Sequence, residues 1–419
     1  MVARPPLSSA SALSALPRAA ESSENTRHRL IAAATDLIAH EGIAAASARA
    51  IAASAGASAS AINYNFGNIE RLLLSVFEQA VEDARAWLSQ RTAEITALPR
   101  TPDGAAWALR HVLDAWTSDG RRLALLYQEA LAADAGPATA WTRLLRDFWL
   151  DVANHFGLRS VDGRLMHAFF ESEALYHLST WSPALESAVL TEMVEHLANV
   201  WLGTPARPWR EALPKAEEAS GTRPHGSVPP AAMRIAKAAA EVVEDKGLTG
   251  LTHRAVATRA GVTTGSVTHH FRSIEDLVAG AIRGQVQVLT EEATGGAPPP
   301  VDDILTAERL FEALRFHSTA DRPASPVIRR RRLFLASVRR QDLAAAGAVI
   351  RYSHGGTTRD ALERIFTLSE SDLRLHAAVL SRLLSAIWFA CAGDEDPAAS
   401  RHALLDRIET VLLARLKSA

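Results

Sequence analysis

The second half of the chain contains, at residues 249–277, the stretch TGLTHRAVATRAGVTTGSVTHHFRSIEDL. The first half contains a related stretch at residues 44–72, which reads AAASARAIAASAGASASAINYNFGNIERL. The two align without a gap at the offset that separates Gly42 from Gly247. The alignment extends back to Leu30 and Ile235, with 12 identical residues among 43. Repetition at one constant spacing is the signature of a duplicated structural unit.

Each copy opens with the pattern of an amphipathic helix. In the first copy apolar residues recur at Leu30, Ala34, Leu37 and Ile38, and the equivalent positions of the second copy are also apolar. This spacing gives a helix one apolar stripe. A glycine then follows in both copies, and glycine is common just beyond the last helical turn. We therefore expect the first helix of each copy to end there.

Two short helices joined by a tight turn should come next in each copy. The turns are Ser54–Ala57 and Arg259–Val262; each has a glycine that allows left-handed backbone and a preceding alanine small enough for the helices to touch. A fourth helix follows. The pattern predicts a helix-turn-helix in each half. The expected caps of the second, third and fourth helices are Ser47, Ser58 and Asn68 in the first copy and Thr252, Thr263 and Ser273 in the second.

Composition restricts the function classes. The 419 residues carry a formal net charge of −2, so any contact with nucleic acid must come from local patches. The single cysteine excludes an internal disulfide and a CxxC metal site, and we expect no metal and no cofactor. There is no phosphate-binding glycine loop or GxSxG motif, so we do not expect an enzyme. No apolar run approaches the roughly 20 residues of a membrane helix, and there is no convincing signal peptide; we expect a cytoplasmic protein.

At these residues the sequence resembles the tetracycline-repressor (TetR) family, over about 50 residues in each copy. The resemblance implies an all-α fold: two tandem modules, each a DNA-binding head followed by a helical regulatory domain. It also implies a repressor that responds to a small apolar effector. Two departures stand out. Asn63 and Thr268 replace the family's usual tyrosine in the third helix, and Ile69 and Ile274 replace a lysine that grips phosphate.

The third helix of each copy is expected to enter the major groove of double-stranded DNA, with its first turns facing base edges. Asn63 can bond an adenine, and threonine methyl groups can touch thymine. Arg49 and Arg254, on the second helices, are candidate phosphate contacts. The full set of candidate DNA-binding residues is Arg49, Ser58, Ser60, Asn63, Tyr64, Arg254, Thr263, Thr264, Ser266, Thr268, His269 and His270.

The regulatory domains are expected to be helical, and the family resemblance implies that the last two helices of each form a dimer surface. Those helices would span about 162–180 and 183–203 in the first copy and 370–392 and 397–417 in the second. If the four pack as one bundle, a single chain would imitate a homodimer. The resemblance also implies an effector pocket, for which the candidate lining is Trp107, Trp116, Tyr127, Phe148 and Trp149, although plain core packing explains the same aromatics.

The expected organisation follows from these patterns. It is a mobile arm at 1–24, a first head at 25–74, a first regulatory domain at 75–203, a linker at 204–230, a second head at 231–278 and a second regulatory domain at 279–419. Three alternatives stay open. The first head, whose recognition helix is made of small residues, would have lost DNA binding and serve protein interaction. Two chains would pair and present four heads. A duplicated helical bundle would have no role in DNA binding.

Overall fold

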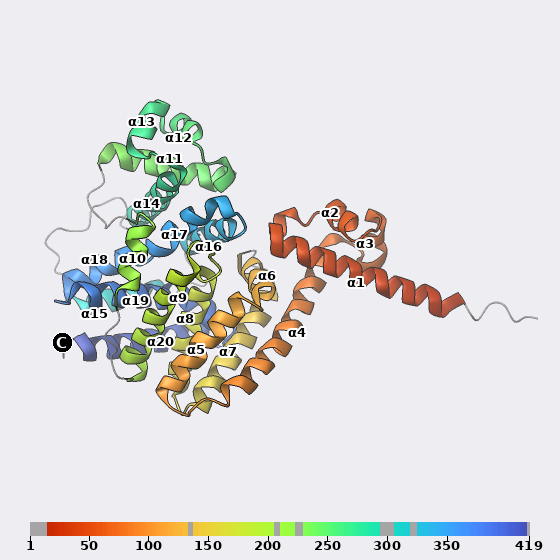
Figure 1. Ribbon diagram of the computed structural model, residues 1–419, viewed down its shortest axis with the longest axis horizontal. Helices are drawn as coiled ribbons and strands as arrows, with labels where there is room; N and C mark the ends of the chain where they lie inside the picture. The colour runs from red at the N-terminus through yellow and green to blue at the C-terminus, as the bar shows by residue number, and fades with distance from the viewer. Residues whose placement is uncertain are drawn as a thin grey trace, which may run out of the picture.

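The structure, a computed structural model, describes residues 15–132, 137–204, 210–222, 229–293, 306–318 and 325–416. Within these ranges every regular element is helical and no strand occurs. Figure 1 shows a helical body from which two smaller lobes project, one containing α1 to α3 and the other α11 to α13. The all-α prediction and the duplication are both confirmed.

The first lobe is a three-helix head built from α1 (Ala15–Glu41), α2 (Ala48–Ser54) and α3 (Ala59–Phe66). The Ser47 hydroxyl accepts the amide of Ala50 at 3.2 Å and caps α2 as predicted. Gly56, in the turn between α2 and α3, has a φ of 61°, a backbone conformation that a side chain would strain. Ile51 and Ile62 are buried between the helices, so this turn sets their crossing.

The second lobe repeats this arrangement with α11 (Pro230–Lys246), α12 (His253–Ala260) and α13 (Thr264–His270). Thr252 caps α12 through the amide of Ala255, at 3.1 Å. Gly261 takes the left-handed turn position, with a φ of 65°. Val256 and Val267 are buried where the first head has its two isoleucines. The equivalence of caps, turn and core therefore extends from sequence to structure.

One long helix leads from each head into the body: α4 (Ile69–Ile95) and α14 (Ile274–Ala293). Asn68 caps α4 through Arg71 at 2.9 Å, and Ser273 caps α14 through Asp276 at 3.1 Å. The predicted boundaries at 74 and 278 thus fall inside continuous helices. A rotation of either long helix must carry its head with it.

The first regulatory domain has a core rich in tryptophan. Trp116, Trp141 and Trp149 are fully buried, and Trp116 lies 6.1 Å from both Trp141 and Phe170 between ring centroids. Aromatic rings at such separations stabilise a core beyond their area alone. Its helices are α5 (Pro102–Thr117), α6 (Arg121–Ala132), α7 (Pro137–His155), α8 (Ser160–Tyr176) and α9 (Pro183–Leu197), with a wide turn over Ala198–Leu202.

The second regulatory domain contains fewer aromatics than the first. Phe311 and Phe334 are its largest fully buried apolar side chains. Its helices are α15 (Ala307–Ser318), α16 (Ser325–Val338), α17 (Ala344–Tyr352), α18 (Gly356–Ile365), α19 (Glu370–Cys391) and α20 (Pro397–Leu416). The buried apolar residues of the two domains form one continuous core, so the halves do not fold as separate bodies.

The two halves meet through α8 and α9 of the first and α19 and α20 of the second. The hydroxyls of Ser172 and Ser385 lie 3.1 Å apart across α8 and α19. On α20, Arg407 pairs with Asp162 of α8 at 2.9 Å. The four helices fall where the family resemblance placed them, and polar contacts as well as apolar ones cross the seam.

Two segments differ from the sequence expectation. The arm at 1–24 is partly wrong, because α1 begins at Ala15; residues 1–14 lie outside the described part. Pro17 falls in the first turn of α1, where proline is tolerated. The linker contains a helix, α10 (Ala212–Ala219), rather than coil throughout. Both oxygens of Glu192 accept amides at the start of α10, from Ala212 at 2.7 Å and Leu213 at 3.0 Å, and this capping offsets the helix's short length.

One described helix bears on the expectation about membrane spans. By length and composition α19 is apolar enough to cross a membrane, and 78% of its most apolar window is buried inside the protein. Arg374 and Arg382 interrupt its apolar sequence. In the fold, α19 is the central helix of the seam between the halves.

Candidate nucleic-acid interface

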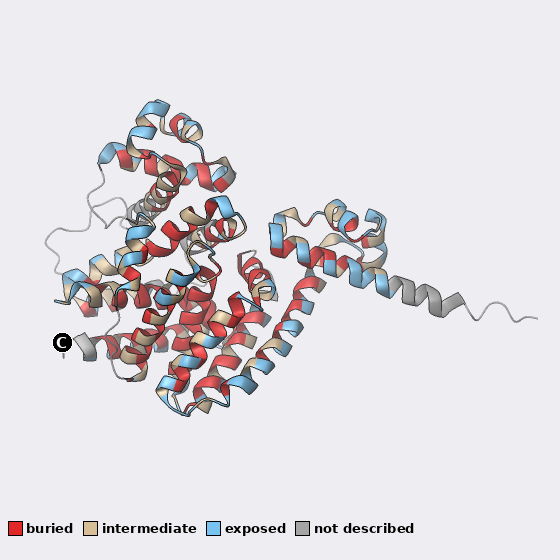
Figure 2. Cartoon of the chain, viewed as in Figure 1, coloured by how far each residue is buried: buried red, intermediate tan, exposed pale blue. Residues whose placement is uncertain are grey.

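Both recognition helices lie on the outside of their heads. Figure 2 shows exposed residues along α3 and α13. Ile62 and Phe66 anchor α3, and Val267 and Phe271 anchor α13. No other part of the described chain covers either helix, so both can approach a duplex.

In the first head, the start of α3 presents small polar groups. Ser58 occupies the cap position but its hydroxyl bonds the hydroxyl of Ser60, at 2.8 Å, instead of a backbone amide. The predicted side-chain cap is therefore wrong for Ser58. Asn63 and Tyr64 are exposed, and Tyr64 is 82% exposed, the largest value among the exposed large hydrophobic residues. A side chain so open in a small head has no packing role.

In the second head, two of the candidate hydroxyls are occupied within the helix. The Thr263 hydroxyl caps α13 through the amide of Ser266, at 3.2 Å. The Thr268 hydroxyl donates back to the carbonyls of Thr264 and Gly265, at 3.2 and 3.1 Å. Their methyl groups remain available for thymine contacts. Thr263, Thr264 and Thr268 are exposed, whereas Ser266 is half-buried.

The aligned arginines Arg49 and Arg254 are both exposed on the second helices of their heads. Within the described residues neither makes an ion pair, unlike Arg259 of the second head, which binds Glu241 and Asp245. An unpaired guanidinium beside a recognition helix suits a phosphate contact. Arg259 does not, because two carboxylates already occupy it.

The two histidines at the end of α13 differ in exposure. His269 is exposed and His270 is half-buried, with their rings 5.0 Å apart. His253, at the start of α12, lies 2.8 Å from the carbonyl of Phe271 and holds the end of α13 against α12. His269 therefore keeps its place among the candidate contacts, while His253 positions the helix.

One contributor near the interface was not singled out from the sequence. Arg27, on α1, lies over the ring of Phe66 at 4.6 Å and donates to the carbonyl of Asn65 at 3.3 Å. It thereby holds the end of α3 while keeping its charge near the DNA-facing surface. In the sequence Arg27 was only a charged residue at the edge of an amphipathic helix, and such a side chain is usually solvated.

The five predicted pocket aromatics do not line one cavity. Trp116, Tyr127, Phe148 and Trp149 are buried and pack on aromatic neighbours; for example, Tyr127 lies 5.2 Å from Trp141 between centroids. Trp107 is 57% exposed, on the surface of α5. A hollow of about 310 Å³ lies instead between the halves, bounded by residues of α8 from the first half and of α14, α15, α16, α18 and α19 from the second.

The comparisons with known proteins agree with this geometry. The family model described as "Bacterial regulatory proteins, tetR family" matches residues 30–76 and again residues 235–281. Both matches run from the first helix of a head into the start of its long helix, and both begin at the positions where the internal repeat begins. A search of the curated proteins gave no match.

Proposed function

Because this chain is a tandem member of the tetR family of bacterial regulatory proteins, we propose that its two heads bind two half-sites of one operator as a pseudo-dimer. On this proposal the chain is a sequence-specific transcriptional repressor that acts in the cytoplasm as a single polypeptide. The two recognition helices would meet successive major grooves about 34–36 Å apart. Since the heads differ in sequence, the operator is an imperfect palindrome.

The observation that carries the proposal is the charged seam between the halves. The carboxylate of Glu173 on α8 is fully buried and binds two arginines of the second half: Arg351 at 2.6 Å and Arg382 at 3.0 Å. Those guanidiniums hold the pKa of Glu173 below its ordinary value against the opposing effect of burial. Removing one member of a buried ion pair is strongly destabilising. Such a seam favours halves that stay together.

A second buried contact ties α8 and α6 to α16. Arg331 forms an ion pair with Glu171 at 2.9 Å and donates a hydrogen bond to the side-chain oxygen of Gln128. Glu171 also accepts a hydrogen bond from the Tyr127 hydroxyl. The surface that a homodimer would use is thus occupied within one chain. This supports the single-chain arrangement over a dimer of chains through the same helices.

The effector response is proposed for the hollow of about 310 Å³ between α8 of the first half and the helices of the second. Ile282 and Arg283, on α14, form part of its wall, and α14 is the helix that carries the second head. A ligand that favours a different α14 position would change the spacing of the heads and lower operator affinity. Leu314 and Trp388 give the hollow an apolar side that suits an apolar effector.

The test combines footprinting with mass measurement. We expect the full chain to protect two half-sites in the DNA upstream of its own gene, one helical turn or a multiple apart. Sedimentation of the free and DNA-bound protein should give one 45.1 kDa chain per operator. Protection of one half-site only, or two chains per operator, would contradict the pseudo-dimer.

A further inference from the structure

A second hollow, of about 610 Å³, lies between the linker helix α10 and helices α17, α18 and α19. The segment Ser353–Gly356 lines both this hollow and the one of about 310 Å³, so it separates the two. The volume is in the range of small-molecule sites. It is bounded on one side by the segment that joins the two halves, and a single-headed relative would have no such segment.

Some of the residues that line this hollow have buried polar atoms without partners. Tyr352 is 5% exposed, and its hydroxyl has no hydrogen-bond partner within the described residues; nor does Nε of the fully buried Arg351. Buried polar atoms are nearly always bonded, so such atoms beside a cavity point to a missing group. Burial raises the pKa of Tyr352 to about 12, so the phenol keeps its proton and can donate it.

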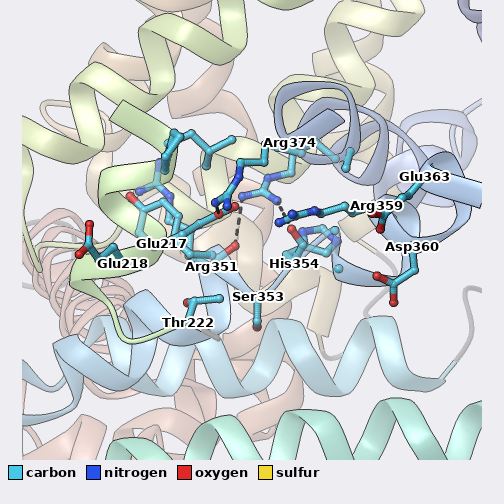
Figure 3. A pocket seen from close by; sticks show the side chains of 18 residues that line it. Glu217, Glu218, Thr222, Arg351, Ser353, His354, Arg359, Asp360, Glu363 and Arg374 are labelled. Atoms are coloured by element: carbon cyan, nitrogen blue, oxygen red, sulfur yellow. Dashed lines mark hydrogen bonds and ion pairs between the residues drawn. The ribbon is translucent and has the colours of Figure 1, made fainter. Parts of the chain in front are cut away.

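Two further arginines stand at the walls. Arg359 of α18 and Arg374 of α19 bind the same oxygen of Glu370, at 2.6 and 2.8 Å. Arg374 also pairs with Glu217 of α10. In Figure 3, Arg359 points from its helix toward His354, while Glu217 comes from the side of α10. The interior is therefore lined by guanidinium groups, and one of them, that of Arg374, also binds the linker helix α10.

The acidic side chains of the hollow lie farther out. Glu218, Asp360 and Glu363 are all exposed, whereas Glu217 and Arg374 are only 19% and 21% exposed in their side chains. Burial raises the pKa of Glu217, although Arg374 opposes the shift. Glu217 is thus a carboxylate held in a partly dry site by one arginine, and a ligand carboxylate could take its place there.

Three contacts hold α10 in position. Glu192 of α9 caps its start, Arg210 just before it pairs with Asp372 of α19, and Glu217 pairs with Arg374. Two of the three go to the second half. Apart from these contacts, α10 buries Leu213 and Ala216.

We propose that this hollow binds a small organic carboxylate. The carboxylate replaces Glu217 as the partner of Arg374 and accepts a hydrogen bond from the Tyr352 hydroxyl. The planar fork of an arginine matches a carboxylate in two parallel hydrogen bonds. Binding releases the end of α10 from Arg374 of α19, while Arg210 still pairs with Asp372.

The direct test is calorimetric titration of the full chain with succinate, benzoate and inorganic phosphate, without DNA. We expect one site per chain for at least one of the two carboxylates. Arg374→Gln should weaken that binding by about tenfold or more, since a charged hydrogen bond is lost. Glu217→Gln should strengthen it, because the internal competitor is gone, and should also expose α10 to proteolysis.

Matched controls are Glu312→Gln, an exposed carboxylate of α15 away from the hollow, and Arg315→Gln, an arginine paired with Asp406 and Glu409 elsewhere on the second domain. Neither should change binding. Binding of phosphate alone, unchanged binding in Arg374→Gln, or no binding of any of the three to the wild type and to Glu217→Gln would each overturn the proposal. Because no DNA is present, a chain that binds a carboxylate but ignores its operator refutes only the proposed function.

Discussion

Arg339 of the second half and Glu129 of the first form an ion pair at 2.7 Å, beneath the first DNA-binding head. The other carboxylate oxygen of Glu129 accepts the amide of Ile43 at 3.2 Å, and Arg339 donates to the carbonyl of Ala39 at 3.2 Å. Both partners therefore bind backbone where α1 ends. The second regulatory domain thus touches the first head directly, across the seam.

Arg339→Gln should destabilise the chain by about 1–3 kcal/mol. Glu129 would keep a buried charge with one hydrogen-bond donor, the amide of Ile43, and the carbonyls at the end of α1 would lose the guanidinium as a donor. Urea unfolding measures this change. Arg340→Gln is the control, since Arg340 is exposed and pairs only with Asp342 close by. Equal losses in the two variants would mean that the contact beneath the head has no special importance.

Arg49→Ala and Arg254→Ala should each weaken operator binding to a similar degree across sequences and reduce the slope of affinity against salt by about one. Gel-shift titrations over a range of salt concentrations give both quantities. Arg259→Ala, which removes an arginine already bound to two carboxylates, should leave the slope unchanged. If only Arg254→Ala has an effect, the first head does not bind DNA, and the protein-interaction alternative holds.

Thr263→Ala and Ser58→Ala separate capping from DNA contact at aligned positions. Thr263 caps α13, so its loss should cost about 1 kcal/mol of local helix stability. Ser58 bonds only Ser60, and its loss should leave stability unchanged. Hydrogen exchange of the amides of Ser266 and Ala61 reports each helix start. Faster exchange in Ser58→Ala than in Thr263→Ala would contradict the assignment.

The buried histidine pair at the seam predicts a loss of stability in mild acid. His196 and His376 lie 3.2 Å apart between ring nitrogens. Burial, His376 and Arg210 hold the pKa of His196 well below its ordinary value, and burial and Arg210 lower the pKa of His376 to about 4. Between the unfolded pKa near 6.5 and about pH 4 the unfolded chain binds more protons, so stability falls as the pH falls through this window.

His376 alone should account for up to about 3 kcal/mol of that loss. Urea unfolding at pH 7, 6 and 5 measures the slope, and His376→Gln should flatten it. His269→Gln, at an exposed histidine of the second head, should leave the slope as it is. A slope that is identical in the wild type and in His376→Gln would show that other groups cause the acid sensitivity.

The heads were predictable because their structure depends on near neighbours in the chain. The apolar stripe around Leu30, the glycine of each turn and the caps Ser47 and Thr252 act within a few residues of themselves, and the duplication repeated each signal. The exception, Ser58, is a case where a nearby hydroxyl competed successfully for the capping oxygen.

Local sequence signals could not decide whether the aromatics line a pocket or whether the linker contains a helix. Whether Trp116 and Trp149 enclose a cavity or fill one depends on the rings brought against them by other helices, which periodicity does not specify. The helix α10 exists because Glu192, from the preceding helix α9, reaches its first amides. Eight residues are too few to hold a helix alone, even though most of them are good helix formers.

What the amino-acid order alone determines here is local: two helix-turn-helix heads, their caps and turns, and the helical character of everything between them. The tertiary structure decided which charges are neutralised across the halves, as at Glu173 with Arg351 and Arg382, and where the hollows lie. The reason is physical: backbone conformation follows from neighbours a few bonds away, whereas burial and ion pairing follow from residues far apart in the chain that only folding brings together.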